Sequence, residues 1–253
     1  MDYDAIVQRT LAAICDGGRV EQTQKASMFG ITQTRFRAWL GGRAFEATVM
    51  IYEEPDDRTG HSLSGIGLRI HSPAPVRMLL GDAKTGSLSL PRVLTGDPSF
   101  DADFRVFGVP EDVLRAVFDP QGCGELRASV LDLQNLWIEQ GKGLLEHKVH
   151  FHVVDDQGSI DTSLEVVRAQ IAFALRLADR ISSASEHVRV QVRQGGGAGA
   201  EAAWLAQANV AVQAAAGRRD RNRMIIVLAV AGLVVVPIVV VLVAVVVLVL
   251  LSN

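Results

Sequence analysis

Three histidines in one short segment have the spacing that a metal site needs. His147, His150 and His152 lie in a stretch that alternates like a β-strand. Side chains two residues apart share a strand face, so His150 and His152 could bind one metal ion, while His147 would face away. A third ligand would have to come from elsewhere, for example from His61 or His71. The alternative interpretation is a polar sheet face in contact with solvent.

A second group of chemically able side chains is acidic. Asp97, Asp101 and Asp103 lie within seven residues, and carboxylates at such spacing can bind calcium. The segment lacks the glycine at the sixth position and the glutamate at the twelfth that an EF-hand loop requires. The alternative is that Asp97-Pro98 begins a turn, with Phe100 and Phe104 as core residues.

Motifs for nucleotide binding and for nucleophilic catalysis are missing from the sequence. Gly65-Ile-Gly67 lacks the third glycine and the following helix of a dinucleotide loop, so a bulge or a close backbone approach is the expectation there. No GxxxxGK[ST] or GxSxG is present. Cys15 and Cys123 form no CxxC and are expected to be buried, inert thiols. We therefore expect no cofactor, and the sequence names no reaction.

Residues 224–251 form an uninterrupted apolar run of 28 residues, 13 of them valine. A run of 18 or more apolar residues predicts a transmembrane helix, because only an internally hydrogen-bonded helix satisfies its backbone in hydrocarbon. A straight helix of that length would reach about 42 Å, beyond the roughly 30 Å hydrocarbon core. Tilt, or a kink at Pro237, would absorb the excess.

The flank of this run predicts its orientation. Basic residues near a span stay on the cytoplasmic side, so residues 1–217 should be cytoplasmic. The first twenty residues contain no apolar stretch long enough for a signal peptide. The sequence thus predicts a single-pass, tail-anchored protein of the bacterial inner membrane, inserted after translation. The arginines of this flank are Arg218, Arg219, Arg221 and Arg223.

Charge excludes one class of partner. The net charge is −3, and the segment 218–223 contributes +3 from four arginines and one aspartate, which leaves −6 for residues 1–217. Nucleic-acid binding requires a basic face, so we expect no nucleic-acid partner. The expected partners are the lipid bilayer and a protein.

Periodicity predicts a mixed fold. Residues 4–15 have helical spacing of apolar residues, whereas residues 31–40 and 43–52 are strand-like and flank a Gly41-Gly42 hairpin turn. A short helix should begin at Pro110 and stop before Pro120. Further strand candidates are 62–71, 76–80, 87–93, 130–139 and 144–154, the last two joined by a turn at 141–143.

A long helix near the C-terminal end should cover the sheet. Thr162-Ser-Leu-Glu165 fits a capping box and precedes an apolar stripe that repeats at helical spacing. Arg168, Arg176 and Arg180 lie on the opposite side. The stripe consists of Leu164, Val167, Ile171, Leu175, Ala178 and Ile181.

These elements predict an α+β fold, an antiparallel β-sheet or roll covered by a long C-terminal helix, followed by one transmembrane helix. The expected organisation is a cytoplasmic domain at 1–193, a Gly/Ala-rich stalk with the arginine cluster at 194–223, and a span at 224–251. Within the stalk, residues 194–200 should be a flexible linker and 201–216 a helix. Trp204 could be an interfacial anchor.

One segment resembles a known family. Thr95-Gly-Asp-Pro-Ser-Phe-Asp-Ala-Asp-Phe-Arg-Val106, followed by Leu114-Arg-Ala-Val-Phe-Asp-Pro120 and Leu136-Trp-Ile138, is similar to bacterial membrane-associated proteins known only as a domain of unknown function. The shared pattern is Asp-Pro-x-Phe-Asp-x-x-Phe-x-Val, and the match covers residues 94–154 well and the earlier strands loosely. The resemblance implies a fold and membrane association, and it carries no catalytic residues.

The function expected from the sequence is a non-enzymatic interaction or regulatory module at the cytoplasmic face of the membrane. The anchor, the stalk and the missing catalytic motifs lead to this expectation. A metal-assisted hydrolase that uses His150 and His152 is the alternative, and a subunit of a membrane complex is a third possibility.

Overall fold

The structure is a computed structural model. It describes residues 3–28, 31–52, 66–87, 89–129, 136–149 and 163–251, and of residues 218–251 it describes the backbone only.

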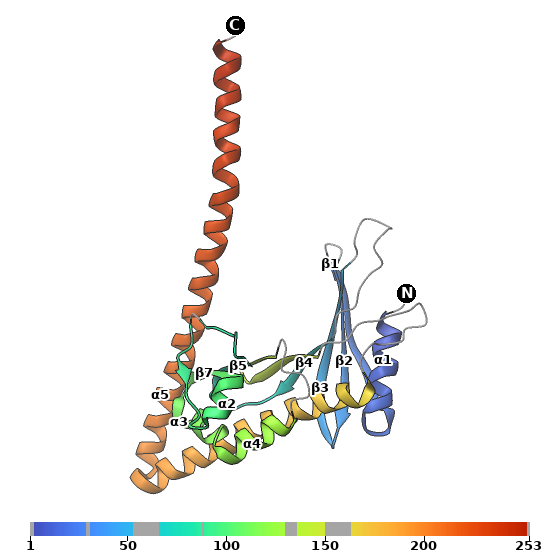
Figure 1. Ribbon diagram of the computed structural model, residues 1–253, viewed down its shortest axis with the longest axis vertical. Coiled ribbons are helices and arrows are strands. Elements are labelled where there is room, and N and C mark those ends of the chain that lie inside the picture. Colours follow the sequence, from blue (N-terminus) through green and yellow to red (C-terminus); the bar gives the residue numbers. More distant parts are fainter. Residues whose placement is uncertain are drawn as a thin grey trace.

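A nine-stranded antiparallel sheet dominates the described chain (Figure 1). The strand order is β1-β2-β3-β4-β9-β8-β5-β7-β6, so the hairpin β8–β9 lies between β4 and β5. The strands are β1 (Val20–Met28), β2 (Ile31–Leu40), β3 (Arg43–Tyr52), β4 (Ile66–His71), β5 (Arg77–Asp82), β6 (Arg92–Val93), β7 (Phe104–Val109), β8 (Trp137–Gly141) and β9 (Leu144–Val149).

Tight turns set the register of two hairpins as the sequence predicts. Gly41 and Gly42, between β2 and β3, have φ of +59° and +72°, a conformation that glycine adopts without strain. Lys142 and Gly143, between β8 and β9, have φ of +52° and +74°. Both predicted hairpins are thus confirmed, and β2 and β3 have the predicted bounds.

Helices cover one face of this sheet. They are α1 (Tyr3–Ile14), the 3₁₀ turn η1 (Asp16–Gly18), α2 (Pro98–Asp103), α3 (Glu111–Val117), α4 (Pro120–Ser129) and α5 (Leu164–Leu251). The part of α5 before Gly197 begins beside α1 and runs beneath the strands toward α3 and α4 (Figure 1). Alternate strand residues are buried against these helices, as Ile66, Leu68 and Ile70 of β4 show. The α+β fold with a covering C-terminal helix is confirmed.

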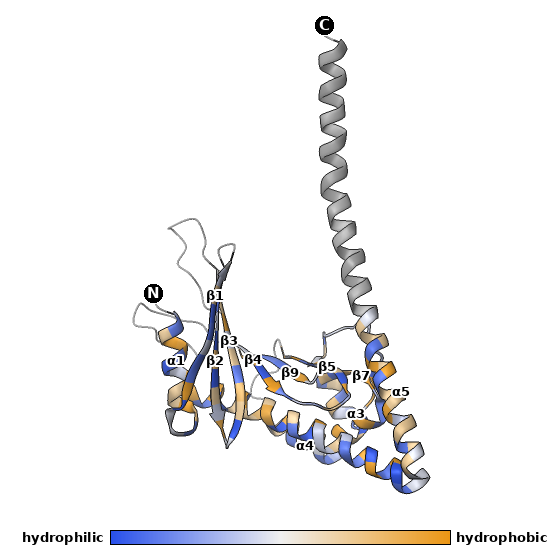
Figure 2. Ribbon diagram, turned by 180° about the vertical axis from the view of Figure 1, so that it is seen from behind, coloured by the Kyte–Doolittle hydropathy of each residue, from blue (hydrophilic) through white to orange (hydrophobic). Residues whose placement is uncertain are grey.

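The predicted apolar stripe of α5 supplies much of the core. Val167, Ile171, Ala178 and Ile181 are fully buried, and Leu175 is nearly so. Figure 2 shows polar residues on the outer side of this helix. Leu164 departs from the prediction because it lies at the first turn and is 41% exposed.

Arg180, expected to lie among the outward arginines of α5, instead ties α5 to α3 and α4. Its Nε donates to the carbonyl of Val117 at 2.6 Å, and its guanidinium contacts Asp119 and, at 3.2 Å, Glu125. Gly122 of α4 leaves the space for this side chain, since a Cβ there would meet Arg180 and the Val117 carbonyl. Arg180 is therefore a structural residue.

Two elements escaped the sequence pattern. Six of the nine residues of β1 are polar, so it shows little apolar alternation, yet it pairs with β2 over its length. Helix α4 begins at Pro120, where the sequence suggested only the end of α3. Conversely, the candidate strand at 87–93 is reduced to Arg92–Val93.

The segment 194–200, expected to be a flexible linker, is helical on both sides of a break at Gly197, where φ is +73°. Ion pairs cross this break, since the carboxylate of Glu201 lies 3.2 Å from Arg189 and 3.6 Å from Arg193. The indole of Trp204 donates to Asp112 of α3 at 2.8 Å, so this tryptophan holds the second part of α5 against the domain. It is not free to act as an interfacial anchor.

Helix α5 extends to Leu251 and so includes the apolar run 224–251. Among the helical residues whose side chains the structure describes, none forms a helix long and apolar enough to cross a membrane. The predicted span itself lies outside those residues and stays a prediction.

The buried stripe of α5 gives the first test. Leu175→Asp should destabilise the domain by roughly 3 kcal/mol or more, because it buries an unpaired charge. Arg176, the next residue, is exposed, so Arg176→Asp should change the melting temperature little. Thermal denaturation of both variants checks this, and equal shifts would contradict the helix face assigned here.

Candidate binding site on the open sheet face

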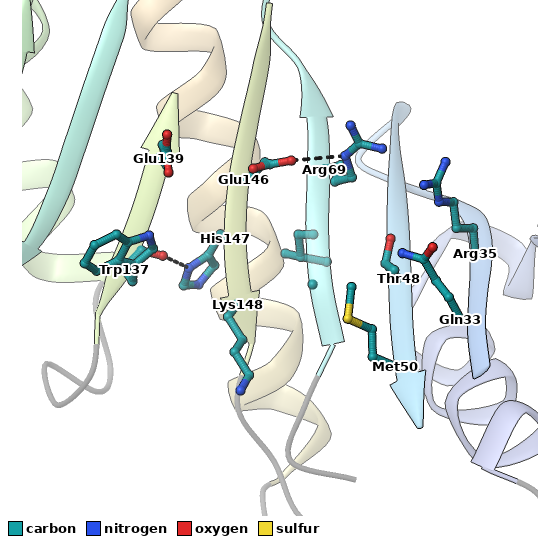
Figure 3. A pocket seen from close by; sticks show the side chains of 12 residues that line it. Gln33, Arg35, Thr48, Met50, Arg69, Trp137, Glu139, Glu146, His147 and Lys148 are labelled. Carbon is teal, nitrogen blue, oxygen red and sulfur yellow. Dashed lines mark hydrogen bonds and ion pairs between the residues drawn. The ribbon is translucent and has the colours of Figure 1, made fainter. Parts of the chain in front are cut away.

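A hollow of about 520 Å³ lies on the sheet face that α5 leaves open (Figure 3). Five neighbouring strands, β2, β3, β4, β9 and β8, line it. Its volume falls in the range of small-molecule sites, roughly 300–1,000 Å³. The lining residues are Gln33, Arg35, Thr48, Met50, Gly67, Leu68, Arg69, Trp137, Glu139, Glu146, His147 and Lys148.

Strand pairing brings together residues that are far apart in the sequence. Arg35 of β2 pairs with Thr48 of β3, which pairs with Gly67 of β4, and Gly67 pairs with Lys148 of β9. Residues paired across neighbouring strands point to the same face. The hollow therefore follows one cross-strand row.

Gly67 is the residue of that row that has no side chain. It pairs in register on both sides, so no bulge lies at Gly67, while Gly65, the other glycine of that motif, lies outside the described residues. A Cβ at this position would have only ordinary contacts, the nearest being the Thr48 carbonyl oxygen at 3.7 Å. The hollow is thus open above Gly67 because the residue has no side chain.

Two hydrogen-bond donors in the row have no partner among the described residues. Thr48 is 8% exposed, and its Oγ1 is buried without a hydrogen bond. The Nε of neighbouring Arg35 is also buried without a hydrogen bond. An unsatisfied buried polar group costs roughly 1–3 kcal/mol. Arg35 also has no ion pair within the described part of the chain, although it is a cation beside a cavity. The site is therefore built to donate hydrogen bonds.

The remaining charges of the hollow are largely compensated. Arg69 donates to Glu146 at 3.2 Å and lies 3.8 Å from Glu46. Glu139 lies 3.9 Å from Arg77, a guanidinium that is 7% exposed. The acidic side of the hollow is thus held in ion pairs, and Arg35 is not part of them.

Two apolar side chains stand at the margins. Met50 of β3 is 49% exposed and Trp137 of β8 is 47% exposed, and both line the hollow. His147 fixes the backbone of Trp137, since its Nδ1 donates to the Trp137 carbonyl at 3.2 Å. The site offers unsatisfied donors together with apolar surface.

Most of the histidines predicted as metal ligands cannot be placed relative to this site. His150, His152 and His61 lie outside the described residues, so the metal prediction stays untested, and His71 is exposed at the end of β4. No group of three or more His, Cys, Asp or Glu side chains among the described residues is arranged to hold a metal ion.

The aspartates of the segment 97–103 bond to the protein itself. Asp97 caps α2 by accepting from the backbone N–H groups of Ser99 and Phe100 at 2.9 and 3.1 Å. Asp101 accepts from Thr95, and Asp103 pairs with Arg127 at 3.4 Å.

Phe100 and Phe104 are core residues, as the alternative interpretation of this segment predicted. They are 1% and 2% exposed, and their rings stack at 4.7 Å. The segment is a structural turn and cap in the described chain.

Both cysteines are buried, as predicted. Burial raises the pKa of Cys15 to about 11, and burial also raises the pKa of Cys123. A thiol is nucleophilic only as the thiolate, so neither residue is suited to nucleophilic chemistry near neutral pH.

No family model matches the sequence, and no curated protein matches it. Among solved structures, the chain is similar to the mycobacterial trehalose monomycolate transport factor A, TtfA. The sequence identity is 11%, the TM-score is 0.39, and the match covers 70% of this chain and 91% of that chain.

The sequence did not single out Arg35, Thr48 or Lys148. For Arg35 the sequence does contain an indication, because Gln33, Arg35 and Arg37 occupy the polar positions of an alternating strand. This alternation predicts that the three side chains lie on the open face of the sheet. Lys148 joins the row of Arg35 and Thr48 only because β4 pairs with β9.

Removing the unsatisfied hydroxyl should increase stability. Thr48→Val keeps the shape but deletes the buried donor, so we expect the free energy of unfolding to rise by about 1 kcal/mol. Thr10 is a matched control, since its Oγ1 donates to the Ile6 carbonyl at 2.9 Å, and Thr10→Val should lower that free energy by about 1 kcal/mol. Chemical denaturation measures both, and a loss in both variants would show that Thr48 has a partner.

Cys15 predicts a pH dependence of stability. Its pKa is near 11 in the folded chain against an ordinary 9.0, so its contribution is full below pH 9 and is lost as the pH rises to 11. The stability difference between the wild type and Cys15→Ala should fall by about 2 to 3 kcal/mol over that interval. Denaturation at pH 8, 9, 10 and 11 measures it, and a constant difference would contradict the shifted pKa.

Proposed function

We propose that this chain is a non-enzymatic binding module held at the cytoplasmic face of a membrane, with the open sheet face as its binding surface. The observation that carries the proposal is the connection between the two parts of α5. The part before Gly197 supplies the apolar stripe of the domain, and the part after it contains the apolar run 224–251. The domain would thus be joined to the bilayer through its own core helix.

Contacts on either side of Gly197 support a fixed connection. Trp204 bonds to Asp112, and Glu201 pairs with Arg189 and Arg193. Ala208 and Ala215, farther along the helix, are buried. The second part of α5 is therefore held against the domain, so the open sheet face would have a defined position relative to the membrane.

The chemistry of the described residues favours binding. The lining carboxylates form ion pairs, and the thiols are buried with raised pKa values. What the hollow has in excess is hydrogen-bond donors, at Arg35 and Thr48. The resemblance of residues 94–154 to a membrane-associated bacterial family agrees with the proposed location.

Membrane association is tested by carbonate extraction of bacterial membranes that contain the full chain. We expect the full chain to remain in the pellet, because an apolar helix of this length inserts favourably. The double variant Val235→Asp/Val241→Asp should move to the supernatant, since each acid at the centre of a span costs roughly 2.5–3.5 kcal/mol. A control with Val210→Asp, at an exposed site before the arginines, should behave as the wild type.

The same material tests the orientation. Protease added to intact spheroplasts should leave the domain uncut, and should degrade it after permeabilisation, because the four flanking arginines favour the cytoplasmic side. Cleavage in intact spheroplasts would invert the proposed topology. Complete extraction of the wild-type chain by carbonate would refute the anchor.

A further inference from the structure

We propose that the hollow on the open sheet face binds a small monocarboxylate with an apolar chain. The carboxylate would lie on Arg35 and Thr48, and the chain would extend over Gly67 between Met50 and Trp137. This inference rests on the proposed function as a binding module and does not depend on where the module is located.

The unsatisfied donors indicate that the ligand has an anionic head group. The Nε–H of Arg35 and the hydroxyl of Thr48 belong to residues paired across β2 and β3, so they are neighbours on one face. Both are hydrogen-bond donors, and a guanidinium binds the two oxygens of a carboxylate or phosphate in a fork geometry. Both atoms are buried in the structure, so a bound anion would satisfy them after the two side chains rotate toward the hollow.

The charge balance selects a monoanion. Apart from His147, the lining residues include three cations, Arg35, Arg69 and Lys148, and two carboxylates, Glu139 and Glu146. The net lining charge is therefore +1. Because Glu139 and Glu146 also line the hollow, a dianion at Arg35 would leave a net charge of −1 there. A carboxylate fits this balance, and a phosphate monoester at neutral pH does not.

The shape of the hollow selects the rest of the ligand. It crosses the strands from β3 to β8, over β4 and β9, which is about 14 Å at the usual strand spacing. Its floor is the backbone at Gly67, and its margins are the half-exposed Met50 and Trp137. An extended apolar chain would cover these two side chains and exclude water from Arg35, which strengthens the ion pair.

Octanoate is the probe that tests the site. Equilibrium dialysis of labelled octanoate against the full chain in nanodiscs, with protein-free nanodiscs as the blank, should show about one saturable site per chain. Octyl phosphate and octylammonium are the comparison ligands. We expect octanoate to bind at least tenfold more tightly than either, because only it matches the charge of the hollow.

Two variants address the residues. Arg35→Gln removes the charge and should weaken octanoate binding at least tenfold. Gly67→Leu fills the hollow above a position where a Cβ has only ordinary contacts, and should abolish saturable binding. Arg37→Gln is the matched control, since Arg37 is an exposed residue on the same strand and face outside the hollow, and should bind as the wild type.

The outcomes separate this inference from the proposed function. Uptake equal to the blank, tighter binding of octyl phosphate, or equal losses in Arg35→Gln and Arg37→Gln would overturn the monocarboxylate site. Unchanged melting temperatures of the variants, with the binding losses described, would support it. Carbonate extraction tests the membrane anchor separately, so the anchor and the monocarboxylate site can each be refuted without the other.

Discussion

Burial of one sheet face by helix α5 is the constraint on which the rest of the structure depends. A half-buried antiparallel sheet must alternate, with apolar residues toward the helix and polar residues toward solvent. The apolar stripe of α5 and the buried residues of β4 satisfy this constraint on one side. The same alternation then forces Arg35, Thr48, Arg69 and Lys148 onto the open side, where the hollow is located.

Ion pairs stabilise one part of the open face, and a neighbouring part keeps hydrogen-bond donors that a ligand could use. Arg69 is shared between Glu46 and Glu146, and these contacts span β3, β4 and β9, so the charges fix the strands beside the hollow. Arg35 and the hydroxyl of Thr48 lie in the next row and have no such partners in the described chain. Proteins retain unsatisfied buried donors at functional sites more readily than elsewhere, because a ligand can compensate them.

Local signals in the sequence predicted the parts of the fold that local physics determines. The Gly41-Gly42 turn and the alternation on either side gave β2 and β3 their bounds, and the stripe of α5 gave its buried face. Strand β1 was not predictable, because a polar edge strand has no apolar period. The hollow was not predictable either, because it depends on β9 lying next to β4, a contact between residues about eighty positions apart. His150 and His152 have the spacing of metal ligands, but this spacing does not supply a third ligand.

If Arg35 on the open face binds a carboxylate, its side-chain Nε–H must respond directly to the ligand. The most direct measurement is the ¹⁵N–¹H NMR signal of the Arg35 side-chain Nε–H, assigned by loss in Arg35→Lys and followed during an octanoate titration. We expect this proton to shift downfield and to saturate with octanoate while the Arg37 signal stays in place, because charge-assisted hydrogen bonds to carboxylates are short and strong. An Arg35 signal that does not move, or that moves together with the Arg37 signal, would show that Arg35 does not bind the carboxylate.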